Sequence, residues 1–168
     1  MIRQLAIEPL TRAAFAPFGE VIETAGVTPR FINEGTTERF HALARTNVAA
    51  SGGKAIISIF HANRRPFPFL VRMLERHPWG SQAFYPLSNH DWLVVTGLGE
   101  LRPDAASIRC FRAAGQQGIN YARDVWHHPV LCLRPTQDFL VVDREGPGKN
   151  LEECWFEHPA EQRLIAVD

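Results

Sequence analysis

The chain has 168 residues, enough for a single domain, expected to span residues 1–168, that buries about two-thirds of its unfolded surface. Its 18 lysines and arginines balance 18 acidic residues, so composition does not favour a nucleic-acid or anionic-membrane partner. No apolar run approaches the ~20 residues that span a bilayer and no signal-peptide pattern opens the chain, so we expect a cytoplasmic protein without a membrane partner.

The first quarter of the chain has few regular elements. Thr11 is predicted to cap a short helical turn over residues 10–15, which Pro17 ends. A strand is expected at 20–23, and Gly-containing turns at 26–29 and 33–35. Residues 38–44 mix polar and apolar side chains without a clear period.

From residue 54 the chain becomes β-rich. Ala55–Phe60 is a nearly continuous β-branched run, typical of a strand buried on both faces. Two prolines predict a loop over 62–68. Residues 69–77 fit a helix or a strand, and we choose the strand because Pro78 ends it and strand-like residues follow.

The remaining elements are short strands separated by Gly and Pro turns at intervals of roughly 8–12 residues, a pattern that predicts an antiparallel sandwich or closed barrel. The expected strands are 82–85, 92–96, 107–112, 119–121, 125–128, 130–133, 138–143 and 152–156. Residues 130–133 and 138–143 are predicted to form the last hairpin. The three cysteines, Cys110, Cys132 and Cys154, lie among apolar neighbours and are interpreted as buried thiols.

Two polar clusters interrupt this apolar pattern. In a strand, residues two apart share a face, so Glu75 and His77 point the same way, and His127 points away from its neighbours Trp126 and His128. After the break at residues 78–80, Gln82 restarts the alternation. A single histidine in a strand is more often structural than functional, but two polar clusters that each contain a histidine favour a functional site. We predict that Glu75, His77, Gln82 and His127 meet in the mouth of a small barrel.

The chemistry of this set allows two interpretations. Imidazole and carboxylate groups suit a transition metal, with the amide oxygen as a weak fourth ligand. Without a metal, the same groups provide a general base, a general acid and a hydrogen-bonding clamp.

Several motifs along almost the whole chain resemble those of one family. They are Ile32–Gly35, Glu38–His41, Glu75–Pro78 with Ser81–Phe84, Gly118–Tyr121, Val125–Pro129, and Asp138–Leu140 with Asp143–Arg144. Together they resemble the ureidoglycolate lyase family of the cupin superfamily. Against the general cupin pattern, Glu75 takes the place of the first His, His77 the second, Gln82 the Glu, Asp124 the Gly, and His127 the final His.

The resemblance implies an all-β fold, an antiparallel cupin-like β-barrel (double-stranded β-helix) with a few short helices. It also implies a homodimeric carbon–nitrogen lyase that cleaves ureidoglycolate into glyoxylate and urea during allantoin (purine) breakdown. A divalent ion such as Ni²⁺ would be held by Glu75, His77, Gln82 and His127. The substituted ligand set leaves metal-free chemistry open as well, and no organic cofactor is expected.

Ureidoglycolate is a carbinolamine, which collapses when its hydroxyl loses a proton and the departing urea nitrogen gains one. The predicted catalytic residues are His77, His127 and Glu75, with the acid and base roles left open. Gln82, Ser81 and Tyr121 are predicted to bind the substrate. The candidates for a clamp on its carboxylate are Arg39, Arg64, Arg72 and Arg76, with Arg39 and Arg64 preferred.

Three alternatives stay open from the sequence. An amidohydrolase would release ammonia from the same substrate, because residue types do not reveal which bond breaks. A metal-dependent cupin oxygenase or isomerase would require a fuller ligand set. A ligand-sensing barrel without turnover is the non-enzymatic alternative.

Overall fold

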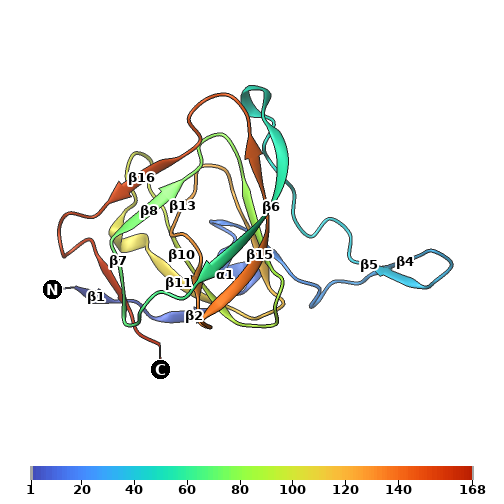
Figure 1. Cartoon of the computed structure of the whole chain (residues 1–168), viewed down its shortest axis with the longest axis horizontal. Coiled ribbons are helices and arrows are strands. Elements are labelled where there is room, and N and C mark those ends of the chain that lie inside the picture. Colours follow the sequence, from blue (N-terminus) through green and yellow to red (C-terminus); the bar gives the residue numbers. More distant parts are fainter. Residues whose placement is uncertain (1, 168) are drawn as a thin grey trace.

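Two β-sheets face each other across the body of the molecule (Figure 1). A computed structural model describes residues 2–167. The five-stranded sheet has the order β3 (Gly19–Ile22), β12 (Gly118–Tyr121), β9 (Gln82–Pro86), β15 (Thr136–Glu145) and β6 (Lys54–Asn63). The seven-stranded sheet has the order β16 (Glu152–Trp155), β8 (Met73–Arg76), β13 (Trp126–His127), β10 (Trp92–Gly97), β11 (Arg109–Ala113) and β2 (Ile7–Pro9), with β14 (Leu131–Cys132) also paired to β10.

Smaller elements complete the fold. A three-stranded sheet combines β1 (Arg3–Gln4), β17 (Arg163–Ile165) and β7 (Phe69–Val71), and β4 (Arg30–Ile32) pairs with β5 (Thr37–Arg39). The helical segments are α1 (Arg12–Phe15), η1 (Ala50–Gly52) and η2 (Ala105–Ser107). Most strand pairs are antiparallel, so the predicted all-β, cupin-like fold with a few short helices is confirmed. Within residues 2–167, no helix combines the length and apolar character needed to cross a membrane.

An aromatic core lies between the two large sheets. Trp92 and Val94 of β10 meet Phe139 and Val141 of β15, and the rings of Trp92 and Phe139 are 4.9 Å apart at their centroids. The alternate β10 residues, Leu93 and Val95, belong to a second cluster on the other face of their sheet. Because both faces of β10 are covered, all six of its residues are buried.

The predicted helical turn and the strand over residues 69–77 are confirmed, with one refinement. The Thr11 hydroxyl oxygen accepts a hydrogen bond from the Ala14 N–H at 3.1 Å and caps α1. Residues 69–76 are extended, but they divide at Arg72 into β7 and β8, which belong to different sheets. The expectation of buried, unpaired thiols is also confirmed, for Cys110, Cys132 and Cys154.

The prediction that Ala55–Phe60 is buried on both faces is wrong. These residues lie in β6, which is at the edge of its sheet and, within residues 2–167, pairs with β15 alone. The outward side chains of Ile57 and Ile59 are therefore 72% and 58% exposed. An apolar run indicates a strand, but it does not distinguish a central strand from an edge strand.

The predicted hairpin of residues 130–133 and 138–143 is also wrong. β14 pairs with β10 in one large sheet, whereas β15 pairs with β9 and β6 in the other. Between β14 and β15 the chain crosses from one large sheet to the other. Each strand then packs its inner face against the same core, but from opposite sides of it.

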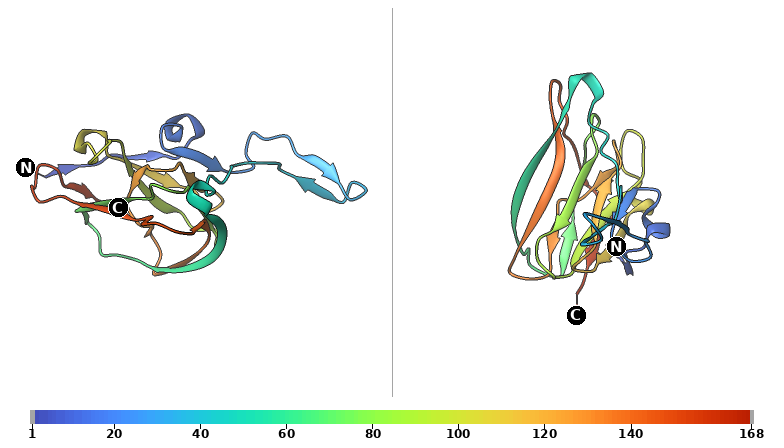
Figure 2. Two further views of the ribbon diagram at one scale, coloured as in Figure 1. Left: turned by 90° about the horizontal axis from the view of Figure 1, so that it is seen from above. Right: turned by 90° about the vertical axis from the view of Figure 1, so that its right-hand side faces the viewer.

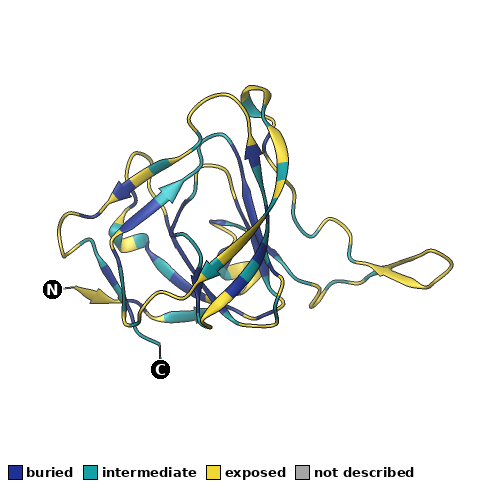
Figure 3. Ribbon diagram, viewed as in Figure 1, coloured by how far each residue is buried: buried dark blue, intermediate teal, exposed yellow. Residues whose placement is uncertain are grey.

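The β4–β5 hairpin projects away from the body of the molecule (Figures 1 and 2). Its turn contains Asn33 and Glu34 with positive φ, in the place where the sequence predicts a turn. Every residue of both strands is exposed, as Figure 3 shows in yellow, and Phe31 retains 65% of its accessible surface.

Candidate active site

Polar side chains form a layer at one end of the aromatic core. From the seven-stranded sheet, His127 lies directly opposite Glu75 on β8 and Thr96 on β10, so the three share a face. His77 follows β8 two residues after Glu75. From the five-stranded sheet, Tyr121 lies opposite Gln82, and Gln82 bonds to Asp143 of β15. We call these seven residues the polar layer.

The predicted partners Glu75, His77 and His127 converge on one point. Glu75 Oε1 lies 3.7 Å from His127 Nε2 and 4.0 Å from His77 Nε2. The three ligand atoms all lie within 4.8 Å of one another. The His127 side chain is almost fully buried, whereas those of Glu75 and His77 keep 17% and 15% of their accessible surface, so solvent reaches the cluster through these two.

Backbone carbonyls set the orientation of both imidazoles. His77 Nδ1 lies 2.7 Å from the Asn150 carbonyl oxygen, and His127 Nδ1 lies 2.9 Å from that of Val125. A carbonyl only accepts, so each Nδ1 carries the hydrogen and each Nε2 presents a lone pair towards Glu75. Neither buried Nε2 has a hydrogen-bond partner among residues 2–167. Converging acceptors of this kind favour a shared proton or a bound cation.

Burial changes the proton affinities in this cluster. It raises the pKa of Glu75, which His77 partly offsets and Glu153, directly opposite on β16, reinforces. It lowers the pKa of His127 to about 3, with a further contribution from His77. Burial also raises the pKa of Tyr121, and the Glu75 carboxylate adds to this effect. His127 is therefore neutral at physiological pH, and Glu75 holds a proton more readily than an exposed glutamate does.

Glu75, His77 and His127 could also hold a metal ion. Two imidazoles and one carboxylate form a donor set that suits divalent first-row transition metals. The two unpartnered Nε2 atoms are the atoms that would coordinate, and each imidazole donates its other ring N–H to a carbonyl, as metal-bound histidines commonly do.

The predicted substrate-binding residues separate into two groups. Tyr121 and Gln82 belong to the polar layer, and the Tyr121 ring stacks on His127. Ser81 precedes β9, and its hydroxyl oxygen accepts the Asn47 N–H at 2.8 Å. With Asn47 and Asn120, Ser81 lines a separate cavity of about 280 Å³ that includes no member of the polar layer.

None of the four candidate arginines belongs to the polar layer. Arg39 lies on the projecting hairpin, and Arg72 is an exposed residue between β7 and β8. Arg64 packs its guanidinium over the Phe67 ring and lines a cavity with His90 and Asp91. Arg76 is adjacent to Glu75 but points to the opposite side, where it pairs with Glu152 and Asp124 and covers the Trp126 ring.

Sequence reasoning missed two members of the polar layer, Thr96 and Asp143. Asp143 continues the inward alternation of Phe139 and Val141, and this period of two is a signal that could have found it. Thr96 likewise follows Trp92 and Val94 on the inner face of β10. Its position opposite His127, however, is set by the register between β10 and β13, which local alternation does not reveal.

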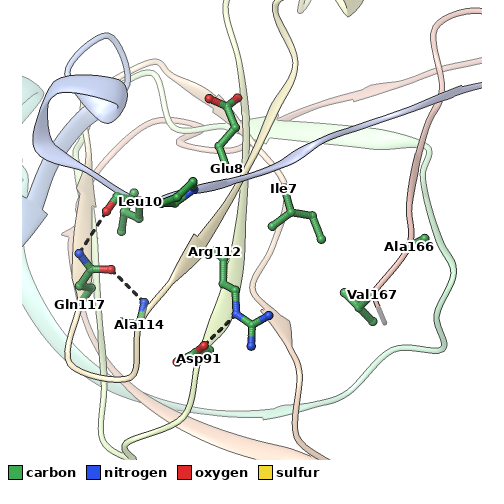
Figure 4. Close-up of a pocket in the computed structure, with 10 residues that line it drawn as sticks. Ile7, Glu8, Leu10, Asp91, Arg112, Ala114, Gln117, Ala166 and Val167 are labelled. Atoms are coloured by element: carbon green, nitrogen blue, oxygen red, sulfur yellow. Dashed lines mark hydrogen bonds and ion pairs between the residues drawn. The ribbon is translucent and has the colours of Figure 1, made fainter.

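A larger cavity lies elsewhere on the molecule. Figure 4 shows this hollow of about 490 Å³, in which Arg112 pairs with Asp91 at 2.8 Å and Gln117 bonds to the Leu10 carbonyl and the Ala114 N–H. None of its ten lining residues belongs to the polar layer. Cavity size alone therefore does not identify the cluster of converging acid–base groups.

Comparisons with known proteins show the family of this chain. Residues 2–163 match the family model described as ureidoglycolate lyase. A protein of Rhizobium etli named "Ureidoglycolate lyase" is 55% identical over 156 residues, covering 92% of this chain and 93% of its own. A Pseudomonas entomophila protein of the same name is 54% identical over 164 residues, covering 98% and 97%. "Ureidoglycolate lyase 1" of Rhizobium meliloti is 54% identical over 158 residues, covering 94% and 92%. The chain belongs to the ureidoglycolate lyase family.

Proposed function

We propose that this protein is an enzyme that cleaves ureidoglycolate into glyoxylate and urea, as a step of allantoin breakdown. The names of its relatives support the substrate. The observation that carries the chemistry is the convergence of two imidazole Nε2 atoms on the partly buried Glu75 carboxyl. Such a cluster can take up a proton and return it within a few ångströms, which carbinolamine collapse requires.

The reaction balances without any further reactant. The substrate hydroxyl loses its proton, its oxygen forms the aldehyde double bond, and the bond from carbon to nitrogen breaks. The electron pair of that bond goes to the urea nitrogen, which receives a proton. The proton removed at oxygen can therefore be the one delivered to nitrogen, so a small group of proton carriers suffices.

We assign His77, His127 and Glu75 as the proton carriers. With each Nδ1–H held by a carbonyl, both Nε2 atoms are oriented to accept the substrate proton, and passing it on to Glu75 returns His127 to the neutral form that its lowered pKa favours. The raised pKa of Glu75 brings its carboxyl closer to the range in which it accepts a proton and releases it again. Tyr121 holds His127 in place through ring stacking and forms part of the wall against which substrate would lie.

A divalent ion such as Ni²⁺, held by Glu75, His77 and His127, would polarise the oxygens of the substrate as a Lewis acid. In that case Tyr121, Thr96, Gln82 and Asp143 remain to orient the substrate.

We further propose that the enzyme acts as a homodimer in which the β4–β5 hairpin packs on the second copy. An isolated two-stranded hairpin is marginally stable, and this one exposes Phe31. It also places Arg30 directly opposite Arg39, and the repulsion between these cations would be relieved by an anion. Because the hairpin projects away from the body, Arg39 would bind a substrate carboxylate only in the other subunit (Figure 2).

The test is to incubate the purified protein with ureidoglycolate and to measure urea, ammonia and glyoxylate. A lyase yields urea and glyoxylate in equal amounts without ammonia. An amidohydrolase yields ammonia, which would refute the proposed reaction while leaving the substrate correct.

A further inference from the structure

Asp143 occupies a distinctive position in the polar layer. The continuous pairing of β9 with β15 brings Gln82 and Asp143 together, and the pairing of β9 with β12 puts Gln82 opposite Tyr121. Tyr121, Gln82 and Asp143 thus form a row across three neighbouring strands, on the face that packs Phe84 and Val141 into the core. The row begins beside His127, on which Tyr121 stacks with ring centroids 4.0 Å apart.

This row offers two acceptor oxygens without donors. Gln82 Nε2 donates to Asp143 Oδ2 at a long 3.4 Å, which orients the carboxamide. Gln82 Oε1 and Asp143 Oδ1 are buried and lack a hydrogen-bond partner among residues 2–167. A buried acceptor without a partner is costly, and for a carboxylate the cost is greater than for an amide. Two such atoms on adjacent side chains indicate that donors arrive from a ligand.

We propose that Asp143 and Gln82 recognise the ureido group of the substrate through its N–H donors. This inference rests on the proposed function and identifies the part of the site that selects the urea half. A ureido group carries three N–H donors, two of them on its terminal nitrogen. The glyoxylate half carries a carboxylate, which Asp143 would repel. The pair therefore binds the ureido end and leaves the carbinol carbon on the side of Tyr121 and His127.

The test compares two unreactive ligands that differ at one group. N-carbamoylglycine has the substrate skeleton without the hydroxyl and cannot collapse, and N-acetylglycine replaces its terminal NH₂ by a methyl group of similar size. Calorimetric titration of the native protein should show about tenfold tighter binding of N-carbamoylglycine, because one charged hydrogen bond is lost with the methyl group. Equal affinity for the two ligands, or binding of neither, would overturn the inference.

Variants then test whether Asp143 and Gln82 cause the preference for N-carbamoylglycine. Asp143→Asn, which keeps the shape but loses an acceptor and the charge, should reduce the preference to within about twofold, and Gln82→Met should reduce it as well. Asp138→Asn is the matched control, because Asp138 lies on the outer face of the same strand beside His61 and is half exposed. A retained preference in Asp143→Asn would contradict the proposal.

General destabilisation is separable from this effect, because it would weaken both ligands equally and leave their ratio unchanged. The outcome is also independent of the proposed reaction. If the protein releases urea from ureidoglycolate but binds the two ligands equally, only the role of Asp143 is refuted. If it releases ammonia but still prefers N-carbamoylglycine, only the proposed reaction is refuted.

Discussion

Tyr121 stacks face to face on His127, with ring centroids 4.0 Å apart and planes inclined by 14°. Tyr121 comes from β12 in one large sheet and His127 from β13 in the other, so this contact joins the sheets at the polar layer. The stacked ring and the bond from Nδ1 to the Val125 carbonyl restrict His127 to one orientation, which directs Nε2 at Glu75. A preorganised base of this kind needs little reorganisation during reaction.

Replacing His127 should impair catalysis, whereas replacing His128 should impair stability. His127→Ala removes a proposed proton carrier, so kcat and kcat/KM should fall together by about 10² to 10⁴-fold. His128 lies on the other side of the strand, with its ring against Phe69, so His128→Ala should cost about 1 kcal/mol of stability with activity largely kept. Steady-state kinetics and thermal melts of both variants measure this. A well-folded but inactive His128→Ala beside a nearly normal His127→Ala would contradict the assignment.

Metal removal should reduce activity without abolishing it. Glu75, His77 and His127 could hold a divalent ion, but the same groups can also transfer protons unaided. After prolonged chelation we expect partial activity, which Ni²⁺ or Mn²⁺ raises. The metal content of each sample is measured alongside the rate, and Glu75→Gln should weaken ion binding. Unchanged full activity at negligible metal content would rule out assistance by the ion.

Acid should destabilise the fold through the buried imidazoles. Burial lowers the pKa of His128 to about 4 from an ordinary 6.5, so between these values the unfolded chain binds a proton that the folded chain does not. The unfolding free energy therefore rises with pH across this window, and it declines as pH falls from 6.5 towards 4. For His128 alone the change is about 3 kcal/mol. His127 contributes in the same direction.

Denaturant unfolding at several pH values between 7 and 4.5 tests this expectation. His128→Gln retains a hydrogen-bonding side chain but does not titrate in this range, so its stability should depend less steeply on pH. Identical slopes for the native protein and the variant would show that His128 does not carry the effect.

The projecting hairpin should be needed for dimer formation. Phe31→Asp places a charge on its most exposed aromatic position and should shift the protein towards monomer in light scattering after size exclusion. Arg39→Ser should leave the dimer intact and raise KM if Arg39 binds the carboxylate in the other subunit. Leu101→Asp is a control, because Leu101 is 86% exposed on the body of the molecule. A Phe31→Asp protein with the native mass in solution would exclude the hairpin from the interface.

Local alternation was sufficient to predict which neighbours share a face. It separated His127 from Trp126 and His128 and put Glu75 with His77, because side-chain direction in a strand depends only on the backbone of that strand. Arg76 illustrates the same rule, since its position next to Glu75 directs it to the opposite face. Residue types alone also indicated proton transfer or metal binding.

Strand pairing, in contrast, depends on contacts between segments far apart in the chain. The sequence by itself therefore determined the β class, the turn at Asn33 and the orientation of each polar triplet. Only the tertiary structure decided that Ala55–Phe60 is an edge strand, that β14 and β15 lie in different sheets, and that Arg39, Arg64 and Arg72 lie away from the polar layer. It also brought Thr96 and Asp143 into that layer, because register across neighbouring strands is set by packing against the shared core and not by any local pattern.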